Sequence, residues 1–313
     1  MNSFVKYSRL LFSSAVSEVA SARRFKGERV MENLKEIQIS VKNCNESSSC
    51  FTVQAIDKQS FGNYMSGEAA RFWLASMLSF VRARQCQESN AAWQVVELYY
   101  AAYYAVHFTM RLTGFSLSNL DAGAVSHIQR ANLTEKQIAP STGLYKIDFR
   151  DLDNIEFTKM PKGGGSHKDA WCCWESIIKE LLLKAEDDIQ EYASESISLI
   201  EHQKFVYNGG GYGPPKVRSE INYQFKGSLW AFEQPPKRHI NKINEMVLGS
   251  VRAVSGKVSQ PESLIASSNY VVYLATALFD AIINRYPNSI LNKLHQKYAG
   301  EFSEIITNFK PKT

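Results

Sequence analysis

The stretch AAWQVVELYYAAYYAVHFTMRLTG, from Ala91 to Gly114, decides which fold this chain can adopt. It contains no proline and no internal glycine, and Gly114 is a natural end for a helix. Before Arg111 its only formal charge is Glu97, so the helix is apolar on nearly all sides. A helix of this kind is buried on most of its faces. The stretch therefore predicts a long central helix that carries Glu97, His107 and Arg111 into or beside a core.

The rest of the chain predicts a bundle around this helix, whose own span is 91–113. Apolar periodicity predicts further helices at 67–86, 167–200, 240–251, 268–286 and 289–308. Alternation predicts a small hairpin from 36–42 and 51–56, and a short strand at 143–149. Segment 119–142 predicts a long connection or a short helix around 125–130. The expected fold class is mainly α: a helical bundle around a long central buried helix, with a small β element near the N-terminus.

At 313 residues the chain can hold one large domain or two modest ones. We expect four regions. Residues 1–30 form a leader or N-terminal helix, and 31–64 a small β-containing region. Residues 65–236 form the helical core, and 237–313 are C-terminal helices that pack on it.

The first thirty residues leave three interpretations open. Met1 to Phe25 is rich in serine, basic and nearly free of acids, a composition that resembles a mitochondrial transit peptide. Alternatively, Met31 is an internal start, and the codons for 26–30 form a ribosome-binding site in a bacterial source. The third interpretation is an ordinary amphipathic helix.

Cysteine usage and hydropathy bear on location. The five cysteines are odd in number and have no repeated spacing, which indicates a reducing compartment, the cytoplasm, rather than a disulfide framework. Cys172 and Cys173 are neighbours that point about 100° apart on a helix, so we expect no shared metal. No run of about 20 uninterrupted apolar residues occurs, so we expect no membrane span.

Positive charge is concentrated between Lys216 and Lys257, where eight basic residues stand against three acidic ones. Such a segment can attract nucleic acid or an acidic partner, although a solvated face would have the same composition. If it binds nucleic acid, we expect the contacts to come from basic side chains and one tryptophan: Lys216, Lys226, Trp230, Lys237 and Arg238.

The sequence gives little support for a metal site or a nucleotide-binding site. No histidine pairs with another histidine or with a cysteine pair at a spacing typical of zinc, so we expect neither metal nor cofactor. Lys162–His167 reads Lys-Gly-Gly-Gly-Ser-His and places backbone amides at the start of a helix capped by Ser166, where an anion or a small nucleotide could bind. A flexible hinge is the alternative.

The segment Arg218-Ser-Glu-Ile-Asn-Tyr223 is the candidate site. Arg218 and Ser219 can bind a phosphodiester, and Asn222 and Tyr223, about one helical turn along, can orient its 2′-hydroxyl. The aromatic residues that follow, up to Phe232, can stack on bases.

The alternative for this segment is structural. Arg218 would then pair with Glu220 or Glu97, and Tyr223 would pack at the edge of the core. Glu97 itself needs a partner if it is buried, and Arg218, Arg111 or a tyrosine hydroxyl are the candidates.

The long helix, the capped helix from Ser166 and the arginine-plus-polar element together resemble the HEPN superfamily over roughly Gly67 to Pro236. These are helical bundles of prokaryotic toxins, antiphage systems and RNA-processing enzymes. The resemblance implies a metal-independent ribonuclease with an arginine, four to six residues and a histidine, completed across a dimer. Arg218 and Ser219 match the arginine and its polar neighbour, but Tyr223 stands where the histidine is expected, and no other arginine has a histidine at that spacing.

Two hypotheses follow. The first is a HEPN-like, RNA-directed protein of the cytoplasm, either a conditional ribonuclease or an RNA-binding component of a prokaryotic defence or toxin–antitoxin module. The second is a non-catalytic helical adaptor or sensor subunit of a multiprotein complex. A protein partner or a homodimer is expected under both hypotheses.

Overall fold

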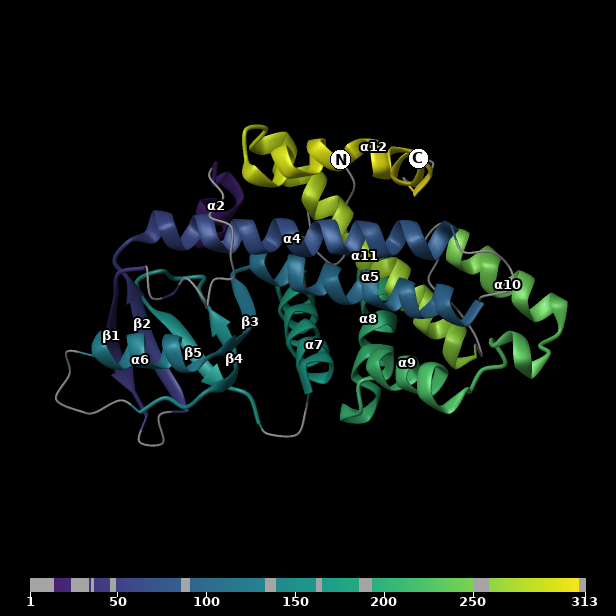
Figure 1. Cartoon of the computed structure of the whole chain (residues 1–313), viewed down its shortest axis with the longest axis horizontal. Helices are drawn as coiled ribbons and strands as arrows, with labels where there is room; N and C mark the ends of the chain where they lie inside the picture. The colour runs from purple at the N-terminus through teal and green to yellow at the C-terminus, as the bar shows by residue number, and fades with distance from the viewer. Residues whose placement is uncertain are drawn as a thin grey trace.

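The computed structural model describes residues 14–23, 34, 37–45, 49–85, 91–132, 139–161, 165–185, 193–249 and 259–309. Two long helices, α4 (Lys58–Gln85) and α5 (Ala91–Leu112), lie side by side along the long axis of the molecule (Figure 1). The small sheet lies at one end of this pair, and α10 (Lys237–Leu248) lies at the other.

Helix α4 begins at Lys58, earlier than the predicted 67. The Asp57 carboxylate accepts a hydrogen bond from the Ser60 amide at 2.9 Å, which satisfies a free N–H of the first turn. Phe61 and Tyr64 in the added turns are buried. The early start was missed because the prediction was based on the apolar stripe from Ala70 onward.

Most side chains of α5 are buried, in contact with α4, α11, α7, α9, α10 and β3. Most of the exceptions form one line along the helix. Trp93, Glu97, Tyr100 and Tyr104, spaced by three or four residues, are exposed or half-buried on this solvent-facing line, and Tyr103 beside it is also half-buried. Gly114, just after the helix, has a φ of +90°, a left-handed conformation that favours glycine.

The sheet is antiparallel with strand order β1-β2-β5-β4-β3. The predicted hairpin is confirmed as β1 (Ile39–Cys44) paired with β2 (Cys50–Ala55), and the predicted third strand as β4 (Gly143–Asp148). Strands β3 (Phe115–Leu120) and β5 (Ile155–Lys159) were not predicted. All but one residue of β3 is buried, including the two serines that alternate with Phe115 and Leu117. The sheet therefore combines strands from both sides of the boundary expected at residue 64.

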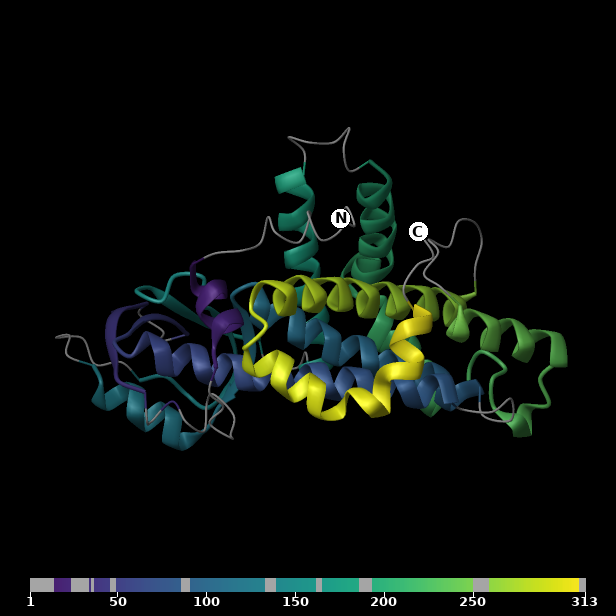
Figure 2. The same ribbon diagram turned by 90° about the horizontal axis from the view of Figure 1, so that it is seen from above.

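The short helix expected around 125–130 is α6 (Ala122–Arg130). The single helix predicted for 167–200 is wrong: α7 (Gly165–Ala185) and α8 (Ala193–Tyr207) are separate, and they contact each other and project together from the layer (Figure 2). The Trp174 indole donates to Nε2 of His202 at 2.9 Å between them. Residues 186–192 contain neither glycine nor proline, so no breaker in the sequence signals the end of α7.

The predicted C-terminal helices 240–251, 268–286 and 289–308 are confirmed with shifted ends as α10, α11 and α12, whereas α9 was not predicted. A short 3-10 turn, η5 (Asn208–Gly210), precedes α9 (Gly213–Gln224), and a second, η6 (Ala231–Glu233), precedes α10. Helices α11 (Gln260–Arg285) and α12 (Ile290–Phe309) are the last two elements of the described residues. Helix α11 has the length and hydropathy of a membrane span, and 72% of its most apolar window is buried inside the protein, as in a core helix.

Part of the N-terminal region packs on this fold. Helix α2 (Ser14–Ser21) buries Val16 and Val19 and contacts α4. The carbonyl of Ala22 accepts a hydrogen bond from the Ile290 amide at 2.8 Å. The other residues on which the transit-peptide and internal-start interpretations depend lie outside the described residues.

Candidate functional site

Arg218 lies on α9, whose start fixes its position. Pro214 and Pro215 occupy the first helical positions, which suits a residue that lacks an amide hydrogen. Gly213 is required just before them, because a Cβ there would sit 2.3 Å from the carbonyl oxygen of Phe205 in α8. Val217 is buried in the turn that carries Arg218. The guanidinium is therefore directed toward α5 and α7.

The Arg218 side chain meets only neutral groups. Its Nη2 donates to the hydroxyl of Tyr100 at 3.0 Å and to Nε2 of His167 at 3.2 Å. The guanidinium also lies 5.4 Å from the ring centres of Tyr99 and Tyr100. Arg218 is 9% exposed, and its Nε is buried without a hydrogen-bond partner. We call Arg218, His167, Tyr99 and Tyr100 the arginine centre.

No carboxylate in the described part of the chain pairs with Arg218. Glu220 pairs with Lys226 at 3.6 Å, and Glu97 pairs with Arg82 at 3.0 Å. The expected ion pairs of Arg218 with Glu220 or Glu97 are therefore wrong. So is the expectation that Glu97 is partnered by Arg218, Arg111 or a tyrosine hydroxyl. The Glu97 side chain is 19% exposed at the solvent line of α5, where Arg82 of α4 can reach it.

His167, in the first turn of α7, completes the centre. Because Arg218 can only donate, Nε2 of His167 must accept, and the neutral ring carries its hydrogen on Nδ1. That Nδ1 donates to the hydroxyl of Tyr99 at 2.8 Å, which also receives the Trp171 indole N–H at 3.3 Å. Burial, with the Arg218 charge adding to it, lowers the pKa of His167 to about 4. The imidazole is neutral at physiological pH.

The arginine centre adjoins side chains that are partly exposed to solvent. Tyr100 and His167 are half-buried, and Tyr223, whose ring centre lies 5.8 Å from the Arg218 guanidinium, is 66% exposed. Among the described residues, the buried Arg218 charge therefore lies beside neutral hydroxyl and imidazole groups, next to partly exposed side chains, without a counter-charge.

The other predicted site residues lie on α9, on α10 or between these helices. Ser219 and Asn222 are half-buried on α9, and Asn222 follows Arg218 by one helical turn. Tyr223 is exposed, so the alternative that it packs at the core edge is wrong. The predicted basic contacts are exposed, and Trp230 is half-buried: Lys216, Lys226, Lys237 and Arg238 lie on α9, on α10 or between them. Residues 162–164 of the predicted anion loop lie outside the described residues.

Sequence reasoning missed the pairing of His167 with Arg218. His167 is the last residue of the Lys162–His167 segment, which was one candidate anion site, whereas Arg218 belongs to a second candidate site, Arg218–Tyr223. No spacing rule joins residues that far apart. The only signal was that each segment could, by itself, bind a phosphate.

A second buried arginine, Arg111 on α5, does have a carboxylate partner and provides a comparison with Arg218. Arg111 donates from Nε to Oε2 of Glu68 at 2.6 Å, and both side chains are nearly inaccessible. Its Nη1 donates to the carbonyl oxygen of His107 at 3.1 Å. Burial, with Arg111 adding to it, holds the pKa of His107 well below its ordinary value. This is a closed ion pair, unlike the arginine centre.

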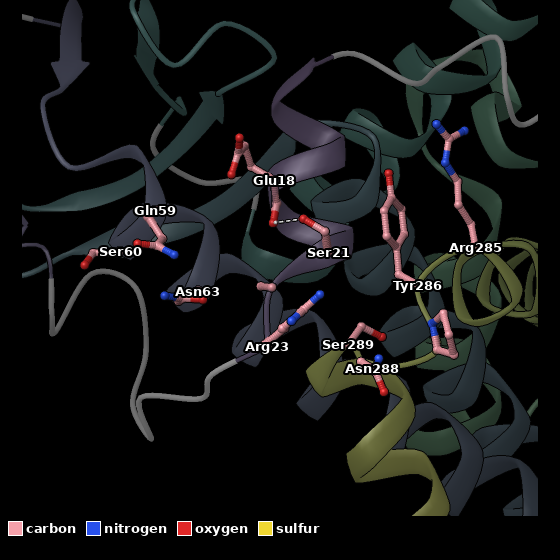
Figure 3. Close-up of a pocket in the computed structure, with 12 residues that line it drawn as sticks. Glu18, Ser21, Arg23, Gln59, Ser60, Asn63, Arg285, Tyr286, Asn288 and Ser289 are labelled. Carbon is pink, nitrogen blue, oxygen red and sulfur yellow. Dashed lines mark hydrogen bonds between the residues drawn. The ribbon is translucent and has the colours of Figure 1, made fainter.

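A cavity of about 1000 Å³ lies elsewhere, where α2, α4 and the turn between α11 and α12 meet (Figure 3). Arg23 and Arg285 line it together with Glu18, Asn63 and Ser289. None of the residues predicted for a site lines this cavity. Its charges are of both signs, so it does not select an anion in the way that Arg218 does.

Among the described residues, no group of three or more histidine, cysteine, aspartate or glutamate side chains could hold a metal ion. Comparisons with protein-family models, with curated proteins and with solved structures found no match to this chain. The arginine centre therefore has to be interpreted from its own chemistry.

Proposed function

We propose that this chain is an RNA-directed, HEPN-like protein that binds a phosphodiester at the arginine centre. It acts as a conditional, metal-independent ribonuclease or as the RNA-binding component of a prokaryotic defence or toxin module. One observation carries the proposal: Arg218 is a buried cation whose partners, Tyr100 and His167, are neutral. Buried charges are normally paired, so an anionic ligand is the missing partner.

RNA supplies the chemistry for cleavage at such a site. The 2′-oxygen attacks the adjacent phosphorus, the bond from phosphorus to the 5′-oxygen breaks, and the 2′-proton ends on the leaving 5′-oxygen. The products are a 2′,3′-cyclic phosphate and a 5′-hydroxyl. Arg218 would hold the non-bridging oxygens, where negative charge grows in the transition state. The neutral His167 can accept a proton, and a bound phosphate would raise its pKa.

The proposal includes a role for His167 that the resemblance does not assign. In the HEPN motif the histidine follows the arginine closely along the chain, whereas here His167 reaches Arg218 from another helix. A homodimer, implied by the resemblance, belongs to the same proposal.

The alternative is a non-catalytic adaptor or sensor subunit. It is supported by the exposed aromatic side chains near α9, among them Phe225 and Phe232, which could equally contact a partner protein. The absence of a histidine five to seven positions after Arg218 also favours it.

The experiment that tests the proposal measures the integrity of RNA in cells that express the protein. Wild type, Arg218→Ala and His167→Ala are expressed from an inducible promoter, with Arg130→Ala, an exposed arginine on α6, as the matched control. Total RNA is run on a denaturing gel with tRNA and rRNA probes. We expect new fragments with wild type and Arg130→Ala, none with Arg218→Ala, and about 10²–10⁴ slower cleavage with His167→Ala. Intact RNA from every protein would favour the adaptor.

A further inference from the structure

Four aromatic side chains form an exposed cluster at the end of the molecule where α5 begins. Trp93 projects from α5, and its ring centre lies 5.6 Å from that of Trp230. Trp230 stacks on Phe232 at 5.7 Å, and Phe225 meets Phe232 edge-on at 5.4 Å. Phe232 is 65% exposed and Trp93 is 43% exposed. We call Trp93, Phe225, Trp230 and Phe232 the aromatic platform.

The backbone beneath the platform is held in an unfavourable conformation. Phe225, Ser228 and Gln234 have φ values of +54°, +51° and +50°, in the left-handed region that favours glycine. The segment is nevertheless fixed. The Trp230 indole donates to the carbonyl oxygen of Ile221 at 2.9 Å, and the Glu233 carboxylate accepts from the Trp230 amide at 2.9 Å. Backbone strain of this kind is commonly found at functional sites, and here it accompanies apolar rings that are exposed to solvent. Together these two features indicate a functional surface.

The charges at the edge of the platform are mainly positive, and the nearby carboxylate of Glu97, one helical turn from Trp93, pairs with Arg82. Lys226 follows Phe225 directly, and Lys237 and Arg238 come shortly after Phe232; all three are exposed. Lys226 pairs with Glu220, whereas Lys237 and Arg238 have no ion pair among the described residues. Glu233 is engaged with backbone amides. Exposed rings with a cationic edge match the bases and phosphates of a nucleic acid strand.

The platform and the arginine centre lie on the same helix. Trp93 and Tyr100 belong to the solvent-facing line of α5, and Tyr100 receives the hydrogen bond from Arg218. Seven residues of helix separate them by about 10 Å along the axis. Three stacked nucleotides cover about the same length at 3.4 Å each. One strand can therefore contact both sites.

We infer that the aromatic platform stacks the bases of single-stranded RNA whose phosphate lies at Arg218. This inference rests on the proposed function and specifies its substrate class. A duplex does not fit, because its bases are already paired and stacked and cannot turn onto protein rings.

The test is binding of a fluorescein-labelled single-stranded oligoribonucleotide, measured by anisotropy and by quenching of tryptophan fluorescence. Trp73, Trp171 and Trp174 are buried, so quenching reports on Trp93 and Trp230. Phe232→Ala and Phe232→Leu should each weaken binding about five-fold or more, because both lose the ring. Phe232→Tyr should bind as wild type.

Leu183→Ala, which removes an equally exposed apolar side chain from α7, is the matched control and should bind as wild type. Because Phe232 is mostly exposed, its variants should fold, and thermal melts verify this. The same RNA annealed into a duplex should bind at least five-fold more weakly than the single strand.

Three results would overturn the inference. Phe232→Leu could bind as wild type while Phe232→Ala does not, which would indicate apolar docking of a protein. The duplex could bind as tightly as the single strand. Phe232→Ala could leave affinity unchanged while Arg218→Ala abolishes cleavage, in which case the proposed function stands and the platform fails. Loss of binding in Phe232→Ala with no effect of Arg218→Ala on binding or cleavage would support base stacking on the platform, but would overturn both the proposed function and the placement of the phosphate at Arg218.

Discussion

Replacing Arg218 by methionine should change stability little, because no carboxylate is left without a partner. The substitution removes two hydrogen bonds from a cation, to Tyr100 and His167, each contributing about 1.5–3 kcal/mol. It also removes a buried charge without a counter-charge, which costs several kcal/mol in the native state. The two effects oppose each other, so we expect a net change in the free energy of unfolding within about 1 kcal/mol.

Arg111→Met is the matched control. Arg111 is more deeply buried than Arg218, at 1% against 9% exposed, and its partner Glu68 is a carboxylate that the substitution would leave charged and unpaired. Removing one member of a buried ion pair costs about 3–5 kcal/mol. In a chain of 313 residues a change of 1 kcal/mol moves the melting temperature by about 1.5 °C. Arg111→Met should therefore lower it by about 5 °C or more, and Arg218→Met by no more than about 2 °C.

The assay is thermal and urea unfolding with and without inorganic phosphate. If the arginine centre binds an anion, phosphate at about 100 times its dissociation constant should stabilise wild type by about 2.7 kcal/mol. It should leave Arg218→Met unaffected. Sodium chloride at matched ionic strength controls for general salt effects.

Two results would refute this reasoning. Arg218→Met could lose as much stability as Arg111→Met, which would make Arg218 a structural residue with a partner. Phosphate could instead stabilise Arg218→Met as much as wild type, which would place the anion elsewhere, for example in the cavity beside Arg23 and Arg285.

Two further predictions concern His167 and Glu97. The folded-state pKa of His167, about 4, lies below its ordinary value of 6.5, so between these pH values the unfolded chain binds a proton that the folded chain does not. The free energy of unfolding therefore decreases as pH falls from 6.5 to 4. His167→Gln should make this decrease smaller, as measured by urea unfolding at graded pH. An unchanged dependence of the unfolding free energy on pH would mean that the imidazole is not held neutral. Glu97→Gln should cost about 1 kcal/mol or less, because its partner Arg82 is mostly exposed, whereas a loss of 3 kcal/mol would show that Glu97 is a buried partner after all.

Much of the helical architecture could be predicted from local sequence. The stretch from Ala91 to Gly114 predicted α5 almost to the residue, because a helix end needs only a short-range signal such as a glycine. The hairpin of β1 and β2 followed from alternation in the same way. The break between α7 and α8 could not be predicted, because the apolar period continues on both sides of it.

The candidate site likewise has features that local sequence predicts and features that it does not. Local sequence placed Arg218 in a basic, aromatic-rich segment and His167 at the start of a helix after a glycine loop. It did not predict that these two side chains meet at 3.2 Å, that Glu97 pairs with Arg82, or that Trp93 contacts Trp230; these contacts are seen only in the folded protein. They could not be predicted because helix ends and burial patterns depend on neighbours within a turn or two. Contacts between helices depend instead on how whole elements pack, and no local spacing records that packing.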